Sequence, residues 1–284
     1  DIRSGSYDTL FIPARRGSQR LGFHNHPFWL RLGIRNSTGT ELQRILELSP
    51  GLGASVTFFE PDANGYRERH SGTDLAIPWA DLRSREQLFL INLPANETRV
   101  YYVRIVPSLS FGFSLNLHDL PGHAERQLSR DLPYLLLGGL IAGLILLSLG
   151  LWLYSRQHLF LYFSLFETSS LIGLAASAGF LGAFWLPVPG LQPRAETFFE
   201  LLAIGFAALF SIEFLPLRNR LPMLHRAMRV TAVLFAGLAL FSLSLPIMSA
   251  GMLAYGGSFA GALLFAAVGI TALQRGLPRA GLFL

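Results

Sequence analysis

The chain has 284 residues, enough for two ordinary domains, and 51% of them are hydrophobic while only 14% are charged. This balance lies outside the norm for soluble proteins and indicates a membrane protein. The net charge of +5 comes from arginines scattered along the chain rather than gathered in one patch, which argues against nucleic-acid binding. The lack of cysteine excludes disulfides, thiolate metal sites and cysteine nucleophiles.

The first 130 residues alternate between polar and apolar side chains in short segments. Phe28, Leu30, Leu32 and Ile34 would share one face of an extended strand. Gly, Pro, Asn and Asp separate the segments. This pattern predicts about eight strands in an antiparallel β-sandwich, like a jelly roll, over residues 1–130. We expect strands at 28–34, 42–48, 54–60, 87–93, 99–106 and 111–117.

Aromatic residues are the candidate ligand-binding groups of this sandwich. Five aromatic residues could stack against a sugar ring: Trp29, Tyr66, Trp79, Tyr101 and Tyr102. Arg83 is the polar residue of the candidate ligand-binding set, which also contains Trp29, Tyr66 and Trp79. Tyr66 and Trp79 flank loops and are the stronger candidates for exposed rings. The alternative is that aromatic residues at strand spacing belong to the core.

No pattern in the sequence predicts a metal site, a cofactor or a catalytic group. His24 and His26 would share one face of an extended segment, but no carboxylate or cysteine accompanies them. Asp62 and Asn64 precede Gly65 without the closing glutamate of a calcium loop, so a hairpin turn is the better interpretation. An enzyme is therefore not expected in this stretch of chain.

The sequence changes near Asp131 from this pattern to long apolar runs. Residues 120–130 predict an amphipathic helix that could carry force from the sandwich into the first membrane span. A transmembrane helix needs roughly 20 apolar residues. Five runs qualify, at 134–154, 159–185, 198–215, 230–249 and 252–273, so residues 131–284 predict a polytopic transmembrane bundle. A sixth run begins at 281–284 and would be truncated, and a signal peptide before Asp1 could have been removed.

Arginines mark alternate loops of this bundle. The first loop holds Arg156, and the loops after the third and fifth spans hold Arg218, Arg220, Arg226, Arg229, Arg275 and Arg279. The other loops hold only Arg194, which Glu196 offsets. Because excess arginine marks the cytoplasmic side, we expect residues 1–130 outside the membrane, in the periplasm if the cell is Gram-negative.

Carboxylates and small residues within the spans are candidates for function or packing. Glu167 lies about two turns inside the second span and could be a switch contact between helices. It could also belong to a proton or ion pathway, although no second buried charge lines up with it. The plainer alternative is a carboxyl group that is protonated or bonded to neighbouring Ser and Thr, while Glu200 and Glu213 reach the interface. Glycines in the first and fifth spans indicate close helix packing within the chain, at Gly138, Gly139, Gly143, Gly256, Gly257 and Gly261.

Several segments together resemble a known family. They are 28–36, 56–66, 72–73, 93–94 and 101–104 in the first half, and 154–163, 214–218 and 273–276 in the second. They are similar to bacterial seven-transmembrane receptors with diverse intracellular signalling modules, with the type 2 extracellular domain. The resemblance implies a periplasmic sandwich suspected of carbohydrate binding, seven helices, and a cytoplasmic kinase, cyclase, phosphodiesterase or phosphatase domain. Only five spans and the first residues of a sixth are present, and no output domain follows.

Three functions remain open at this point. The first is a signalling receptor whose sandwich binds a carbohydrate or another small ligand and relays occupancy through the helices to an output domain. The second is a protein-interaction scaffold, in which the sandwich binds its own copy or a partner receptor. The third is a transporter, which would need a polar pathway that the Leu-, Ala-, Gly- and Phe-rich spans do not offer.

Overall fold

The computed structural model describes residues 8–13, 19–22, 26–49, 54–63, 65–72, 84–107, 111–181, 188, 190–215, 217–277 and 279–283. It divides into two compact units, Asp1–Asp131 with Ala178–Gln192, and Leu132–Ser177 with Pro193–Leu284. Each unit has its own buried core.

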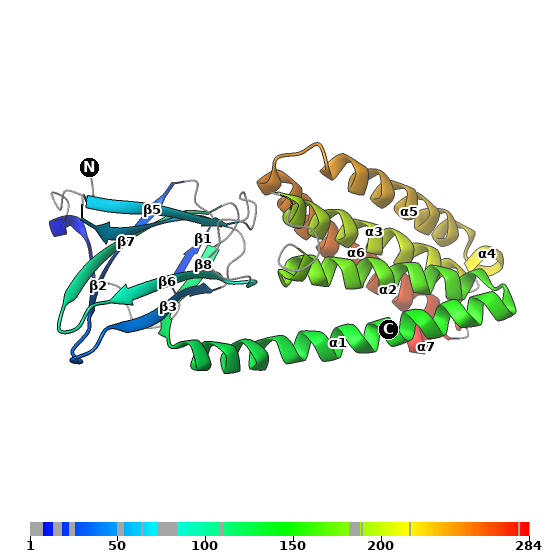
Figure 1. Cartoon of the computed structure of the whole chain (residues 1–284). Helices are drawn as coiled ribbons and strands as arrows, with labels where there is room; N and C mark the ends of the chain where they lie inside the picture. The colour runs from blue at the N-terminus through cyan, green and yellow to red at the C-terminus, as the bar shows by residue number, and fades with distance from the viewer. Residues whose placement is uncertain are drawn as a thin grey trace. The chain divides into compact units, whose positions relative to one another are not determined.

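The described part of the first unit contains eight strands in two antiparallel sheets (Figure 1). One sheet has the order β1-β8-β3-β6 and the other β2-β7-β4-β5, the alternating assignment of strands expected of a jelly roll. The predicted sandwich is confirmed. The strands are β1 (Gln19–Gly22), β2 (Phe28–Arg35), β3 (Leu42–Ser49), β4 (Ala54–Asp62), β5 (Gly65–Gly72), β6 (Gln87–Leu93), β7 (Thr98–Pro107) and β8 (Phe111–His118).

The core of the sandwich lies between the inner faces of the two sheets. Phe58 stacks on Phe89 and Tyr101 there, with ring centroids 4.7 and 5.5 Å apart. The four alternating apolar residues of β2 pack against this cluster, as their spacing predicts. Asn36 joins the strand ends because its side-chain amide donates to the backbone oxygens of Thr40, Leu93 and Pro94.

Two strands differ from the sequence-based expectation. β5 was not predicted because it is a polar strand at the edge of its sheet, paired only with β4. Such a strand lacks the alternation that a half-buried strand shows. The predicted hairpin turn lies between β4 and β5, where Asp62 pairs with Gly65 at φ +123°. β1 was also not expected; it has four residues and, within the described residues, pairs with β8 alone.

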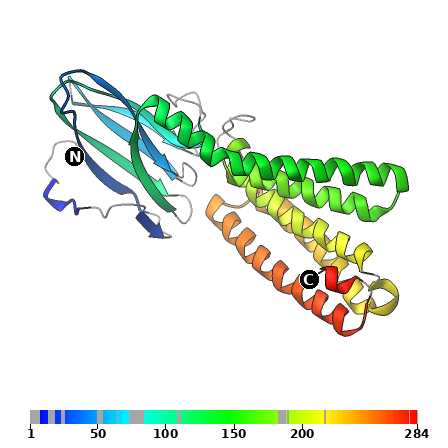
Figure 2. The same cartoon turned by 90° about the horizontal axis from the view of Figure 1, so that it is seen from below.

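The second unit is a helical bundle. Five described helices are long and apolar enough to cross a membrane: α1 (Leu120–Ser155), α2 (His158–Ser177), α3 (Leu191–Phe214), α5 (Pro222–Ser242) and α6 (Ile247–Gln274). The short helix α4 (Leu217–Arg220) precedes α5. The short helix α7 (Ala280–Phe283) is the last described element. A short turn at 156–157 joins α1 to α2, and the two helices lie side by side and antiparallel (Figures 1 and 2).

Several helix ends differ from the predicted spans. α2 ends at Ser177 rather than at residue 185, because a turn follows in which Gly179 adopts φ +88°. Part of the predicted extension, residues 182–185, lies outside the described residues. α5 runs from Pro222 to Ser242 rather than from 230 to 249. It can begin at Pro222 because proline suits the first position of a helix. It ends before Pro246, which stands immediately before α6. The expected loop after it, 245–251, is helical from Ile247 onward.

Close helix packing involves some of the predicted glycines and one that was not predicted. A Cβ added to Gly257 would lie 3.0 Å from Leu201 of α3, and one added to Gly261 would lie 3.1 Å from Ile204. Gly205 of α3 was not predicted, and its Cβ would lie 3.3 Å from the backbone oxygen of Ala232 on α5. Gly139, Gly143 and Gly256 have no such neighbour within 4 Å among the described atoms.

Candidate functional site: an ion-pair joint and an aromatic sheet face

Glu47 lies on the outer face of the β1-β8-β3-β6 sheet, the face turned away from the sandwich core. Leu46 and Leu48 of β3 belong to the core cluster, so the residue between them points outward. Its side chain nevertheless has no exposed surface. A buried carboxylate requires partners, because an isolated buried charge is costly.

The first turns of α1 supply those partners. Arg130 Nη1 donates to Glu47 Oε1 over 2.6 Å, and His123 Nδ1 lies 3.0 Å from Glu47 Oε2. His118, the last residue of β8, places Nε2 at 3.8 Å from the same oxygen. Arg130 also lies 3.7 Å from Glu86 Oε1. We call Glu47, His118, His123 and Arg130 the joint.

A second ion pair lies next to the joint. Arg85 binds Asp131 of α1 through Nη2, and its Nη1 donates to the backbone oxygen of Ala178 over 2.7 Å. The guanidinium carbon of Arg85 lies 4.6 Å from the ring centroid of Phe180. Arg85 therefore connects the chain before β6 with α1 and with the segment that follows α2.

Burial sets the electrostatics of the joint. Desolvation lowers the pKa of His118, and Arg126, His123 and Arg130 lower it further, while Glu47 opposes them. The neutral imidazole is therefore favoured in the folded joint. With His118 neutral, the carboxylate of Glu47 and the guanidinium of Arg130 form an ion pair of no net charge.

α1 links the joint to the first membrane span within one helix. His123, Arg130 and Asp131 lie in its first twelve residues, and its remainder is the first predicted span. Pro133 follows Asp131 by two residues. Proline lacks the N–H that would bond the preceding turn, so α1 lacks one helical hydrogen bond next to the joint.

The outer face of the other sheet, β2-β7-β4-β5, carries a second cluster, which we call the aromatic face: Phe11, Trp29, Phe59, Tyr66 and Tyr102. Trp29 stacks on Phe59 with ring centroids 5.4 Å apart, and Tyr66 meets the edge of Tyr102 at 5.4 Å. Phe59 and Tyr102 are buried and directly opposite in the strand register. Trp29 and Tyr66 remain partly exposed.

Polar side chains share this face with the rings. The strand register places Arg104 opposite Trp29, and places Thr57 between Arg104 and His70. Thr57 Oγ1 and His70 Nδ1 lie 3.3 Å apart. Arg104 and His70 are exposed. Rings fixed by buried partners beside exposed hydrogen-bonding groups are the usual components of a site for a small polar ligand.

The structure describes two of the four residues that were predicted to bind a ligand. Trp29 and Tyr66 lie on the aromatic face, on strands β2 and β5, and are linked through the Phe59 and Tyr102 pair. Trp79 and Arg83 lie outside the described residues, as does His24 of the weak histidine pair. The described residues contain no group of three or more His, Cys, Asp or Glu that could hold a metal ion.

Glu167 lies in α2 and is partly buried. No described residue bonds its carboxylate, and the hydroxyl of the adjacent Thr168 donates to the backbone oxygen of Ser164 instead. The switch role of Glu167 stays a prediction. Glu200, expected at the interface, accepts a hydrogen bond from Ser258 of α6.

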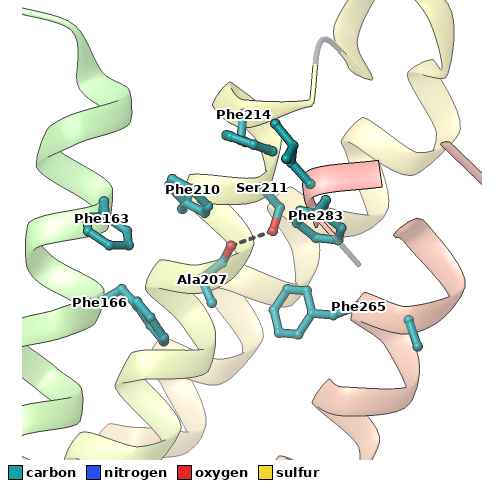
Figure 3. A pocket seen from close by; sticks show the side chains of 10 residues that line it. Phe163, Phe166, Ala207, Phe210, Ser211, Phe214, Phe265 and Phe283 are labelled. Carbon is teal, nitrogen blue, oxygen red and sulfur yellow. Dashed lines mark hydrogen bonds between the residues drawn. The ribbon is translucent and has the colours of Figure 1, made fainter. Parts of the chain in front are cut away.

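The bundle also has an open apolar pocket of about 540 Å³ between α2, α3, α6 and α7 (Figure 3). Most of its lining is aromatic: Phe163, Phe166, Phe210, Phe214, Phe265 and Phe283. The one hydroxyl in the lining, that of Ser211, donates to the backbone oxygen of Ala207 over 2.6 Å. The pocket offers no free polar group to a solute and does not support a transport pathway.

The joint was not predicted from the sequence, although two signals were present. Glu47 is a carboxylate inside the apolar strand Ile45-Leu46-Glu47-Leu48, and residues 120–130 were recognised as an amphipathic helix. What the sequence does not show is their contact, because 76 residues separate Glu47 from His123 and 83 separate it from Arg130.

A jelly roll followed by five helices long and apolar enough to cross a membrane defines a multi-pass membrane protein with a separate β-sandwich domain. Residues 1–119 match the family described as 7TMR-DISM extracellular 2, and residues 130–284 match that described as 7TM diverse intracellular signalling. The chain therefore belongs to the 7TMR-DISM family of seven-transmembrane receptors with diverse intracellular signalling modules. No curated protein and no solved structure matches it. Neither matched domain is of a catalytic type.

Proposed function

We propose that this chain is the sensing and transmembrane part of a bacterial signalling receptor in the inner membrane, with its jelly roll in the periplasm. The observation that carries the proposal is α1, which begins in the joint on the sandwich and continues as the first membrane span. A change in how the sandwich holds the start of α1 would be a change in the first span. The output domain would receive that change on the cytoplasmic side.

The ligand we propose is a carbohydrate that binds on the aromatic face. A sugar ring stacks on Trp29 or Tyr66, and the exposed side chains of Arg104 and His70 offer hydrogen bonds to its hydroxyl groups. The buried Phe59 and Tyr102 hold the two outer rings in place before the ligand arrives, which reduces the entropy lost on binding.

Calorimetry tests this assignment. It measures the binding of a panel of glycans to the full chain in lipid nanodiscs. We expect one or more oligosaccharides to bind, and Trp29→Ala and Tyr66→Ala each to weaken that binding at least tenfold. Gln43→Ala, on an exposed position of the opposite sheet, is the matched control and should leave affinity unchanged. Equal affinity for all four proteins would place the ligand elsewhere, and no binding across a broad panel would contradict direct sugar sensing.

The proposed receptor can also act through a second copy or a partner receptor. The oligomeric state of the chain in nanodiscs, with and without the bound glycan, separates this arrangement from a sensor that works alone.

A further inference from the structure

His118 is a buried titratable group that takes no part in the proposed binding of a sugar. Its side chain is 9% exposed, and its Nε2 has no hydrogen-bond partner among the described residues. That nitrogen lies 3.8 Å from Glu47 Oε2, which is too long for a hydrogen bond. The imidazole therefore stands next to an ion pair without taking part in it.

Charged and titratable groups from β3 and α1 face this imidazole. β3 contributes the carboxylate of Glu47, and α1 contributes three groups: His123, Arg126 and Arg130. Glu86, just before β6, places Oε1 at 3.7 Å from Arg130 Nη1. A proton taken up by His118 would thus meet one close carboxylate and up to three cations on the first turns of α1.

We infer that the joint responds to protons: protonation of His118 releases the first turns of α1 from β3 and β8, so that acid outside the membrane changes the first span without any other ligand. This goes beyond the proposed sugar reception, because the proton binds on the opposite sheet from the aromatic face.

The direction follows from how many protons each state binds. Burial, with smaller contributions from Arg126, His123 and Arg130, outweighs the opposing effect of Glu47 and holds the pKa of His118 below its ordinary value of 6.5 in the docked state. The released state, in which water reaches the ring, therefore binds more protons at mildly acidic pH. The docking of α1 on β3 and β8 is therefore strongest above about pH 6.5 and weakens as the pH falls below that value.

Distances between spin labels in the full chain test this inference directly. The chain has no cysteine, so Gln43→Cys on β3 and Ala124→Cys on α1 would carry the only two labels. In nanodiscs we expect one narrow distance distribution at pH 8 and a second, longer component that grows as the pH falls to 5. A pair within the sandwich, Gln43→Cys with Arg35→Cys, should not change, which shows that the jelly roll stays folded.

Two variants identify the group that titrates. His118→Gln keeps a polar side chain that cannot take up the proton, so the acid-induced component should disappear. Arg126→Gln removes an exposed cation that disfavours protonation of the docked joint, so the component should appear only at lower pH. An unchanged distribution in the parent chain overturns the inference, and so does a full acid response in His118→Gln. Neither result depends on whether the aromatic face binds a sugar.

Discussion

Arg130 of α1 donates a hydrogen bond of 2.6 Å to Glu47 of β3, a carboxylate with no exposed surface. This pair fixes the first turns of the membrane-entering helix on a sheet of the sandwich. The same carboxylate contacts His123, so one acidic side chain holds two points of α1. The proposed relay from the sandwich into the first membrane span begins at this contact.

Glu47→Ala should destabilise the extracellular unit by about 3 kcal/mol. Removal of one member of a buried ion pair leaves the other charge without its partner, and the value lies at the low end of the usual range because Arg130 is one-third exposed. Chemical unfolding of the detergent-solubilised chain, followed by tryptophan fluorescence, measures the change. Glu41→Ala removes an exposed carboxylate six residues earlier and should change stability by less than about 0.5 kcal/mol. Equal effects of the two variants would mean that the pair contributes nothing.

Tyr101→Phe should stabilise the sandwich by about 1 kcal/mol. Tyr101 is completely buried, and its hydroxyl has no partner among the described residues. Burial raises the pKa of Tyr101 to about 12, so the phenol stays neutral and the gain should be the same from pH 6 to pH 9. The same unfolding measurement checks this value. A loss of stability would reveal a hydrogen bond that the described residues do not supply.

Pro133→Ala should strengthen α1 just after the joint. Alanine restores the backbone N–H and is about 3 kcal/mol more favourable than proline inside a helix. Amide hydrogen exchange near residues 129–137 should therefore slow by at least tenfold. Pro222→Ala is the control, because Pro222 is the first residue of α5, where proline costs no helical hydrogen bond. If both variants gave the same protection, Pro133 would not be a weak point of α1.

Gly205→Val should destabilise the bundle by roughly 2 kcal/mol through overpacking. A Cβ at this position meets the backbone oxygen of Ala232 at 3.3 Å, and a backbone atom cannot move aside as a side chain can. Gly256→Val adds the same atoms at an exposed position of α6 with no described neighbour within 4 Å. Thermal unfolding in nanodiscs should separate the two variants, and equal melting temperatures would contradict the close packing of α3 on α5.

Features that depend on local spacing were predictable from the sequence. The period-two pattern of β2 and the apolar runs of the spans identified the jelly roll and the five helices, because burial of one face or of a whole segment leaves a regular pattern. The edge strand β5 has no such pattern. The joint was hidden because its members lie far apart in the chain, and a lone Glu, His or Arg is most often a solvated residue.

The relay through α1 can be measured at the inner end of the helix. Spin labels at Tyr154→Cys, at the end of α1, and Met223→Cys, at the start of α5, occupy exposed positions in a chain without other cysteines. Distances between them in nanodiscs would be compared for the parent chain, Glu47→Ala and the control Glu41→Ala. We expect Glu47→Ala alone to shift the distance distribution, because release of α1 outside the membrane changes its position inside. Superimposable distributions, with the sandwich still folded, would contradict the relay.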